Sequence, residues 1–357
     1  MKKSIMAFLM LSISFGSVQA QTKQTATDLP NISVIGNFLG THTKNETSFD
    51  VKEIEFSFQH YLYPSVKADI FAALHKEDSG ERHFELEEGY ITFSDLLGVI
   101  IPDSDLNLGI GALVGKKLLN VGKINPLHPE QRDFVNRPIV IRQFLGEEEG
   151  LSPEGAQLSY LLPFDFFSQL EMGYWTASSH EEEIGEEHEE SSIEYSNRIF
   201  NTRLWNSFTI DNSKELEVGF SYVIGNVGAA IDTDKQTIYG MDITYTHELS
   251  TNQELKFQSE LYQALYGDDG EERASQSGGF LSGFMKLNDY YQTGIRYGFL
   301  GKHGDEGLVT NQWSILLTRQ LTDTSKFKIQ YNTGENVDNT LSAQFIFGMG
   351  PHSHVLQ

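Results

Sequence analysis

Two segments hold most of the residues that could do chemistry, and the first is an acidic tract with two histidines. Seven glutamates and two histidines lie within residues 180–190. Imidazole and carboxylate groups bind zinc and related divalent ions, and short His-rich tracts are typical of metal binding. The tract has no strict ligand spacing, however, and blocks of like charge usually stay solvated. Weak metal capture and a solvated acidic loop therefore both remain open, with these candidate ligands: His180, Glu183, Glu187, His188 and Glu190.

The second segment is residues 117–153, which carry both signs of charge. A connection of this length without regular structure is usually functional. Folded into a lumen, it would narrow the passage and set a transverse field, as charged rings do in channels. A surface loop packed against its neighbours is the alternative, and we favour the inward fold. The residues expected at the constriction are Lys123, Arg132, Arg137, Arg142, Glu147, Glu148 and Glu149.

The elements that must position these segments show a period of two. In 216–222 and 291–299, large apolar residues alternate with small or polar ones. Since side chains alternate across a strand, each segment has one apolar and one polar face. A soluble sandwich would turn the apolar faces inward, whereas a membrane barrel turns them outward to lipid. In a barrel, these polar residues would line the lumen: Glu53, Glu55, Asp242, Lys256, Glu260, Arg296 and Lys328.

The distribution of the connections decides between these two folds. Tight turns alternate with longer, mostly acidic loops, so that long loops gather on one side, with 95–105 as a longer connection on the short-turn side. Outer-membrane barrels show this segregation. The sequence therefore predicts an all-β, transmembrane, antiparallel up-and-down barrel of about 16 strands, with 14 and 18 as alternatives. The expected strands are 31–43, 49–62, 67–75, 84–94, 106–116, 154–161, 168–175, 200–210, 214–224, 237–248, 253–266, 276–287, 290–299, 311–321, 325–333 and 339–347.

Aromatic residues near the expected strand ends fit the girdles that such barrels place at the two lipid–water interfaces. The alternative is the ordinary preference of aromatic residues for strands, and we favour the girdle. The residues concerned are Tyr61, Tyr63, Tyr174, Trp175, Trp205, Tyr290, Tyr291 and Trp313.

The start of the chain predicts export. Lys2 and Lys3 precede a short apolar run, and small residues lead to Ala20, which is the order found in a signal peptide. We therefore expect a signal peptide at 1–20, a short periplasmic segment at 21–30, the barrel at 31–348 and a tail at 349–357, in the bacterial outer membrane. Because 31–348 occupies nearly all of the mature chain, no plug domain is expected.

Composition limits the partners. The chain has no cysteine, which excludes thiolate metal sites and cysteine nucleophiles. Its formal charge is −24, and loss of Lys2 and Lys3 with a signal peptide would make the mature chain two units more negative. Such a charge repels nucleic acid and suits cationic partners or highly solvated loops.

Several segments resemble one bacterial family. They are 31–36, 84–90, 122–129, 134–138, 144–151, 161–163 and 347–352. In these segments the chain is similar to porin-like proteins often described as putative zinc-regulated, TonB-dependent outer-membrane receptors. The resemblance implies an outer-membrane barrel linked to metal. TonB-dependent receptors pair a 22-stranded barrel with a plugged lumen, so the expected 16 strands without a plug disfavour energised transport.

Together these patterns predict a porin-like channel that passes small solutes, with a link to cations or metals. The alternative is a receptor whose surface loops capture zinc or another divalent metal. An outer-membrane hydrolase using His60 or His128 is the least supported class, so we expect no enzyme. No cofactor is required, although zinc or another divalent cation fits the acidic tract. The expected partners are outer-membrane lipid, the barrel-assembly machinery, solutes or metal ions, and further copies of the chain in a homo-oligomer.

Overall fold

The fold was analysed in a computed structural model, which describes residues 29–76, 82–102, 108–146, 150–177, 195–227, 234–267, 274–303 and 308–351. The predicted signal peptide, nearly all of 21–30 and all but the first residues of the tail lie outside this part of the chain. So do two groups of candidate site residues: Glu147, Glu148 and Glu149, and His180, Glu183, Glu187, His188 and Glu190.

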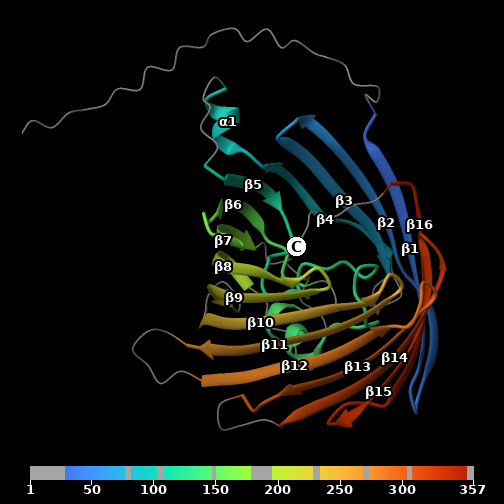
Figure 1. Ribbon diagram of the computed structural model, residues 1–357. Helices are drawn as coiled ribbons and strands as arrows, with labels where there is room; N and C mark the ends of the chain where they lie inside the picture. The colour runs from blue at the N-terminus through green and yellow to red at the C-terminus, as the bar shows by residue number, and fades with distance from the viewer. Residues whose placement is uncertain are drawn as a thin grey trace, which may run out of the picture.

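Sixteen antiparallel strands form one closed barrel, in which each strand pairs with its neighbours in sequence and β1 pairs with β16 (Figure 1). Their bounds are β1 Asn31–His42, β2 Thr47–Tyr63, β3 Val66–Lys76, β4 Arg82–Phe93, β5 Ile110–Lys116, β6 Glu154–Leu161, β7 Phe167–Ala177, β8 Tyr195–Asp211, β9 Lys214–Val227, β10 Asp234–Ser250, β11 Gln253–Tyr266, β12 Ala274–Lys286, β13 Tyr291–Leu300, β14 Thr310–Thr322, β15 Ser325–Glu335 and β16 Thr340–Met349. The predicted fold and strand number are confirmed.

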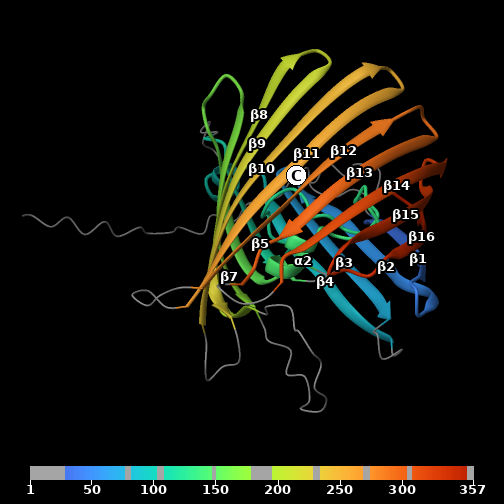
Figure 2. The same cartoon turned by 90° about the horizontal axis from the view of Figure 1, so that it is seen from below.

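Two short helices interrupt this pattern, and the sequence predicted neither. Helix α1 (Leu96–Ile100) lies in the connection between β4 and β5, where Asp95 accepts a hydrogen bond from the backbone N–H of Gly98 at 3.0 Å. Helix α2 (Ile139–Leu145) lies inside the ring of strands (Figure 2). No helix among the described residues is long and apolar enough to cross a membrane.

The two faces of the wall differ as a membrane barrel requires. Leu281 and Ile315 lie on the outer face and are 59% and 56% exposed, whereas their neighbours Ser282 and Ser314 are buried on the inner face. Other outer-face positions are likewise large and apolar, and inner-face positions are mostly polar. The apolar faces therefore point away from the barrel axis, as in outer-membrane barrels and unlike a soluble sandwich.

The aromatic residues divide between the two faces. Tyr61, Tyr63 and Tyr290 are exposed near strand ends, as a girdle requires. The girdle prediction is wrong for Trp175 and Trp205, because both fall on the inward parity of their strands. Trp175 is fully buried and donates a hydrogen bond to Asn201 at 2.7 Å, and Trp205 packs beneath a lysine inside the barrel.

Candidate pore constriction

Residues 117–153, here called the inner loop, leave β5 and return to β6 through the interior of the barrel (Figure 1). The described residues of this loop contact the inner wall in three regions, on β7–β11, on β2 and β4, and on β11–β15. Contacts on so many sides mean that the loop crosses the lumen instead of lying along one strand.

A buried amide and a buried guanidinium hold the inner loop in shape. The Asn125 side chain donates to the carbonyl of Leu119 at 2.8 Å and accepts from the backbone N–H of Leu151 at 3.1 Å, which joins the start and end of the loop. Arg137 is fully buried and donates to the carbonyl of Asn125 at 3.0 Å. The backbone of a loop this deep must form its hydrogen bonds inside the protein. The side chains of Asn125 and Arg137 supply some of these bonds, which neighbouring strands supply elsewhere in the barrel.

Helix α2 and the ends of the inner loop bury an apolar cluster inside the barrel. Val140, Ile141 and Phe144 are fully buried and belong to one cluster with inward-facing residues of the wall, including Trp175. Gly278 on β12 leaves room for this helix, because a Cβ there would lie 2.7 Å from a methyl of Val140. Part of the lumen is therefore packed as a core.

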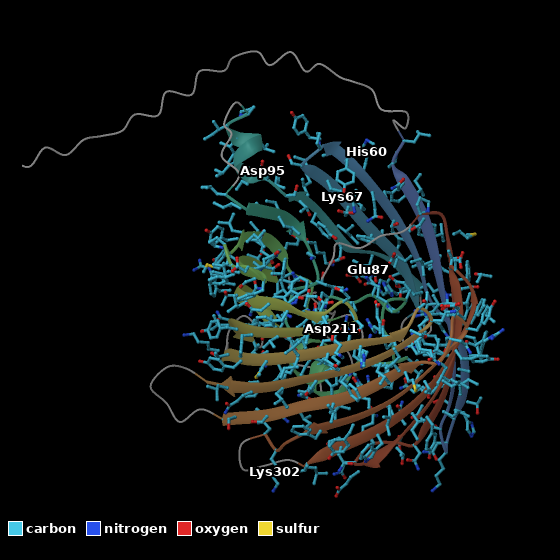
Figure 3. The ribbon with its side chains drawn as sticks, viewed as in Figure 1. His60, Lys67, Glu87, Asp95, Asp211 and Lys302 are labelled. Carbon is cyan, nitrogen blue, oxygen red and sulfur yellow. The ribbon has the colours of Figure 1, made fainter. Side chains whose placement is uncertain are left out.

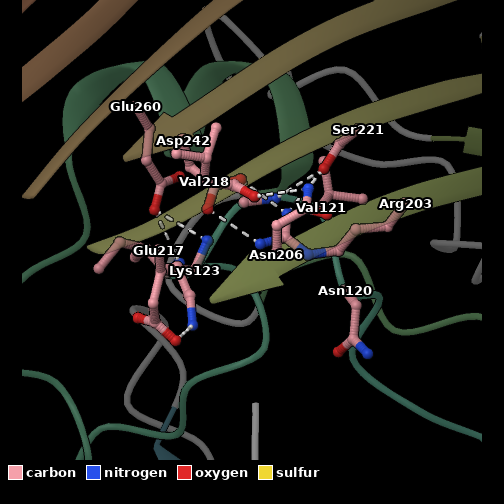
Figure 4. A network of polar contacts seen from close by, with 12 residues as sticks. Asn120, Val121, Lys123, Arg203, Asn206, Glu217, Val218, Ser221, Asp242 and Glu260 are labelled. Atoms are coloured by element: carbon pink, nitrogen blue, oxygen red, sulfur yellow. Dashed lines mark hydrogen bonds and ion pairs between the residues drawn. The ribbon is translucent and has the colours of Figure 1, made fainter. Parts of the chain in front are cut away.

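The first wall contact centres on Glu260 of β11 (Figure 4). One oxygen of its carboxylate accepts the backbone N–H groups of Lys123 and Ile124 at 2.9 and 3.1 Å, and the other accepts the hydroxyl of Tyr262 at 2.6 Å. The N–H of Gly122 also reaches Ser221 at 3.2 Å. Bonds to a charged acceptor are the stronger class of hydrogen bond, so Glu260 clasps the loop to the wall.

Charged side chains extend this contact toward β8, β9 and β10. The Lys123 ammonium donates to Glu217 at 2.9 Å and lies 4.0 Å from the centre of the Trp205 ring. Burial lowers the pKa of Lys123, and the charge of Glu217 offsets only part of that shift. Beside it, Arg203 donates two hydrogen bonds to Asp242 at 2.8 and 2.9 Å. The wall here carries paired charges of both signs.

The second wall contact holds His128 between two carboxylates. Its Nδ1 lies 2.9 Å from Glu55 on β2, and its Nε2 lies 2.9 Å from Glu88 on β4. Burial would lower the pKa of His128, but the hydrogen bonds and charges of Glu55 and Glu88 raise it well above its ordinary value. Two flanking carboxylates therefore favour the imidazolium form of His128, which is hydrogen-bonded to Glu88 through Nε2 and ion-paired with Glu55 through Nδ1. Glu88 also accepts the N–H of Leu118 at 2.6 Å.

The third wall contact uses basic residues of the wall. Lys256 on β11 forms an ion pair with Asp133, and Lys328 on β15 donates to the carbonyl of Arg132 at 2.7 Å. Arg296 on β13 donates to Asn136 twice, at 2.8 Å each. These cations face carbonyl and carboxylate oxygens of the loop, so the attraction draws the loop against this side of the barrel.

The predicted site residues fall in different places. All seven predicted lumen residues lie on the inner face of the wall, and Lys123 and Arg132 lie in the inner loop where it meets the wall. Arg137, by contrast, is enclosed within the loop and faces no open lumen, because its donors are used by loop carbonyls. Arg142 lies in the last turn of α2.

Sequence reasoning missed several residues that hold the constriction: Glu88, Asp133, Arg203 and Trp205. The strand parity could have indicated Arg203 and Trp205, since both alternate with apolar outward residues. Glu88 follows a β-bulge, and Asp133 lies in an irregular segment, so no periodicity marks either.

Comparisons with known proteins agree with this architecture. No family model matches the chain. It is 26% identical over 340 residues to an uncharacterised protein of Aquifex aeolicus, covering 81% of this chain and 68% of that protein.

Three solved structures are similar in fold. The outer-membrane channel DcaP of Acinetobacter baumannii gives a TM-score of 0.59 at 12% identity, with 90% of this chain and 97% of that chain covered. The anion-selective porin from Comamonas acidovorans gives 0.58 at 7% identity, covering 89% and 98%. The trimer form of OmpT from Vibrio cholerae gives 0.57 at 9% identity, covering 90% and 100%. The fold is thus that of outer-membrane porins.

Proposed function

We propose that this protein is a porin-like channel of the bacterial outer membrane that passes small hydrophilic solutes beside a charged inner loop. One observation carries the proposal. A wall that is apolar outside and polar inside encloses a loop tethered to three sides of the lumen by charged contacts. A loop held this way limits the size of a passing solute while leaving charged groups along its path.

The charges along the path favour cations. Glu87 and Glu217 are partly exposed within the barrel, with 17% and 19% of their side chains accessible. The chain as a whole carries a large negative charge. The cations Lys328, Arg203 and Arg296 are instead buried against loop or wall oxygens. Lys123 and Lys256 are also partly exposed, but each is paired with a carboxylate, so they do not outweigh the negative groups that a mobile solute meets.

The experiment is a planar-bilayer recording from the purified full chain. Discrete conductance steps are expected, with a reversal potential in a potassium chloride gradient that shows preference for potassium. Glu217→Gln should reduce that preference, while Glu254→Gln, near a turn on β11, should leave it unchanged. A barrel that gives no steps, or one that prefers chloride, would contradict the proposal.

A receptor that captures zinc or another divalent metal through its acidic loop is the second candidate. Its support is the composition of 180–190, which lies outside the described residues. Deleting 180–190 should abolish zinc retention if that loop is the receptor site. Unchanged zinc retention in the deletion protein would retire this candidate.

We further propose that the barrel assembles as a homotrimer. A trimer form of an outer-membrane protein with the same fold supports this, together with the large apolar outer wall. Light scattering on the detergent-extracted protein should give three chains per particle, and a single chain per particle would refute the trimer.

A further inference from the structure

A cluster of one histidine and two glutamates lies on the inner wall, beside the contact that His128 of the inner loop makes with β2 and β4. It consists of Glu53 on β2, His75 on β3 and Glu87 on β4, and their ligand atoms all lie within 4.8 Å of one another. Glu87 also borders the inner-loop contact, because its carboxylate lies 3.9 Å from His128. Glu53 and His75 are directly paired across the two strands. Figure 3 shows Glu87 inside the ring of strands.

The backbone of β4 is shaped to bring Glu87 inward. Phe71 pairs with Glu88 while Ala72 pairs with Leu86, so Glu87 is the additional residue of a β-bulge. A bulge re-aims side chains that alternation would separate. Here Leu86 faces outward, and Glu87 and Glu88 both reach the interior.

Glu53 carries the second observation. Its side chain is only 6% exposed, and none of the described residues donates a hydrogen bond to its carboxylate or forms an ion pair with it. A buried carboxylate is costly unless it is hydrogen-bonded, paired or bound to a metal. Glu53 also lies beside Glu55 and Glu87, which have the same charge. Among the described residues, Glu53 therefore faces like charges, with His75 as a neighbour of opposite charge when its ring is protonated.

We propose that Glu53, His75 and Glu87 bind a divalent transition-metal ion, such as Zn²⁺ or Co²⁺, inside the barrel. One imidazole and two carboxylates are a donor set that such ions accept. Metal–ligand distances of about 2.1 Å in a tetrahedron place donor atoms roughly 3.4 Å apart, so the side chains need to close by only about an ångström. His75 Nε2 already lies 3.3 Å from Glu87.

A neighbouring set, Glu55, Glu87 and His128, is the weaker candidate. Both ring nitrogens of His128 are already engaged, by Glu55 and Glu88 at 2.9 Å. Binding a metal there would dismantle a contact that anchors the inner loop.

The proposed site is open to water and so to metal entry. His75 and Glu87 are 14% and 17% exposed on their side chains. Three protein ligands also leave coordination positions for water, as in sites where a metal exchanges or reacts. The ion would therefore bind reversibly within the lumen, and binding does not require that the barrel conducts.

The test is a titration of the detergent-solubilised protein with Zn²⁺ by calorimetry and with Co²⁺ by visible absorption. It uses the full chain and a chain lacking 180–190, which removes the acidic loop as a competing site. The deletion protein should bind one equivalent of metal. Glu53→Gln, His75→Gln and Glu87→Gln should each weaken binding at least tenfold, and His75→Gln should change the Co²⁺ spectrum.

His60→Gln is the matched control, because His60 lies on β2 near the opposite end of the strand from Glu53. It should bind metal as the parent does. The strand signal in circular dichroism confirms folding, and Glu87, being partly exposed, offers a variant that tolerates substitution. Absence of binding in the deletion protein, or unchanged affinity in the folded variants, would overturn the site. Either result leaves the channel proposal standing, since conductance is measured separately.

Discussion

The clasp at Glu260 gives the sharpest prediction for how the inner loop is held. Glu260→Ala removes the acceptor of the Lys123 and Ile124 N–H groups and of the Tyr262 hydroxyl. A buried donor left without a partner costs about 1–3 kcal/mol. Two such N–H groups together cost about 2–6 kcal/mol, and we take about 3 kcal/mol as a conservative figure. This free energy shifts the equilibrium between the docked and the released loop roughly 100-fold toward release.

Single-channel recording measures this shift. Glu260→Ala should show frequent excursions to a larger conductance and greater current noise, and trypsin should cleave after Lys123 faster than in the parent. Glu254→Ala, at the turn end of the same strand, should behave as the parent because no loop residue contacts it among the described residues. Identical conductance, noise and cleavage in parent and Glu260→Ala would refute the clasp.

Three further predictions test the helix, an ion pair and the outer wall. Gly278→Val places carbon against Val140 and should destabilise the packing of α2 by about 1–3 kcal/mol, seen as faster proteolysis of the inner loop. Burial would raise the pKa of Asp133, but Lys256 lowers it below its ordinary value of 3.8. The ion pair therefore stabilises the docked loop above pH 3.8, and this stabilisation is lost as the pH falls through the lowered pKa. Current noise should accordingly rise in strong acid. Ile315→Lys should destabilise the folded barrel in lipid vesicles by about 2–4 kcal/mol, measured by urea titration.

Each of these has its own control and its own refuting outcome. Gly283→Ala adds a Cβ in ordinary contact and should be tolerated, so equal proteolysis of the Gly278 and Gly283 variants would count against the helix contact. Asp133→Asn should show raised noise already at neutral pH. If it keeps the acid dependence of the parent, another group is responsible. Leu321→Lys lies on the same outer face near the end of β14 and should cost only about 0–1 kcal/mol, because the cost of a charge in the lipid falls toward the interface; a cost equal to that of Ile315→Lys would mean that lipid is not the outer solvent.

The strands could be predicted because lipid outside and water inside require apolar and polar residues to alternate along each strand of the wall. Leu216–Tyr222 alternates cleanly, and β9 spans it. The rule fails at positions where the inner loop, and not lipid or water, contacts the side chain. Trp175 and Trp205 are aromatic residues on the lumen face because the inner loop and its core cover them. The girdle pattern assigns aromatic residues at strand ends to the membrane interface. It cannot show that the inner loop covers Trp175 and Trp205.

The candidate site was predictable only as a segment. Length and mixed charge indicated that 117–153 folds inward, yet not which charges meet. Arg137 looks like a pore residue in the sequence, but the loop uses it internally to bind its own carbonyls. Glu87 and Glu88 become neighbours on the same face through a bulge, which has no signature in the alternation. Pairing across 40 or more residues, as between Glu88 and His128, requires the closed barrel.

In the proposed channel, ion selectivity would depend on these interior residues and not on the fold. A barrel of the same fold with 7% identity is an anion-selective porin. Here Arg203 is buried and paired with the carboxylate of Asp242, while Arg296 and Lys328 are buried and donate to carbonyl and amide oxygens of the inner loop. The basic groups nearest to Glu87 are two histidines, with His75 at 3.3 Å and His128 at 3.9 Å, and Glu53 lies beside His75. In the proposed channel, the inner loop would narrow the lumen and cover Arg296 and Lys328, so that the carboxylates of the wall would act more strongly on a passing solute than these two cations.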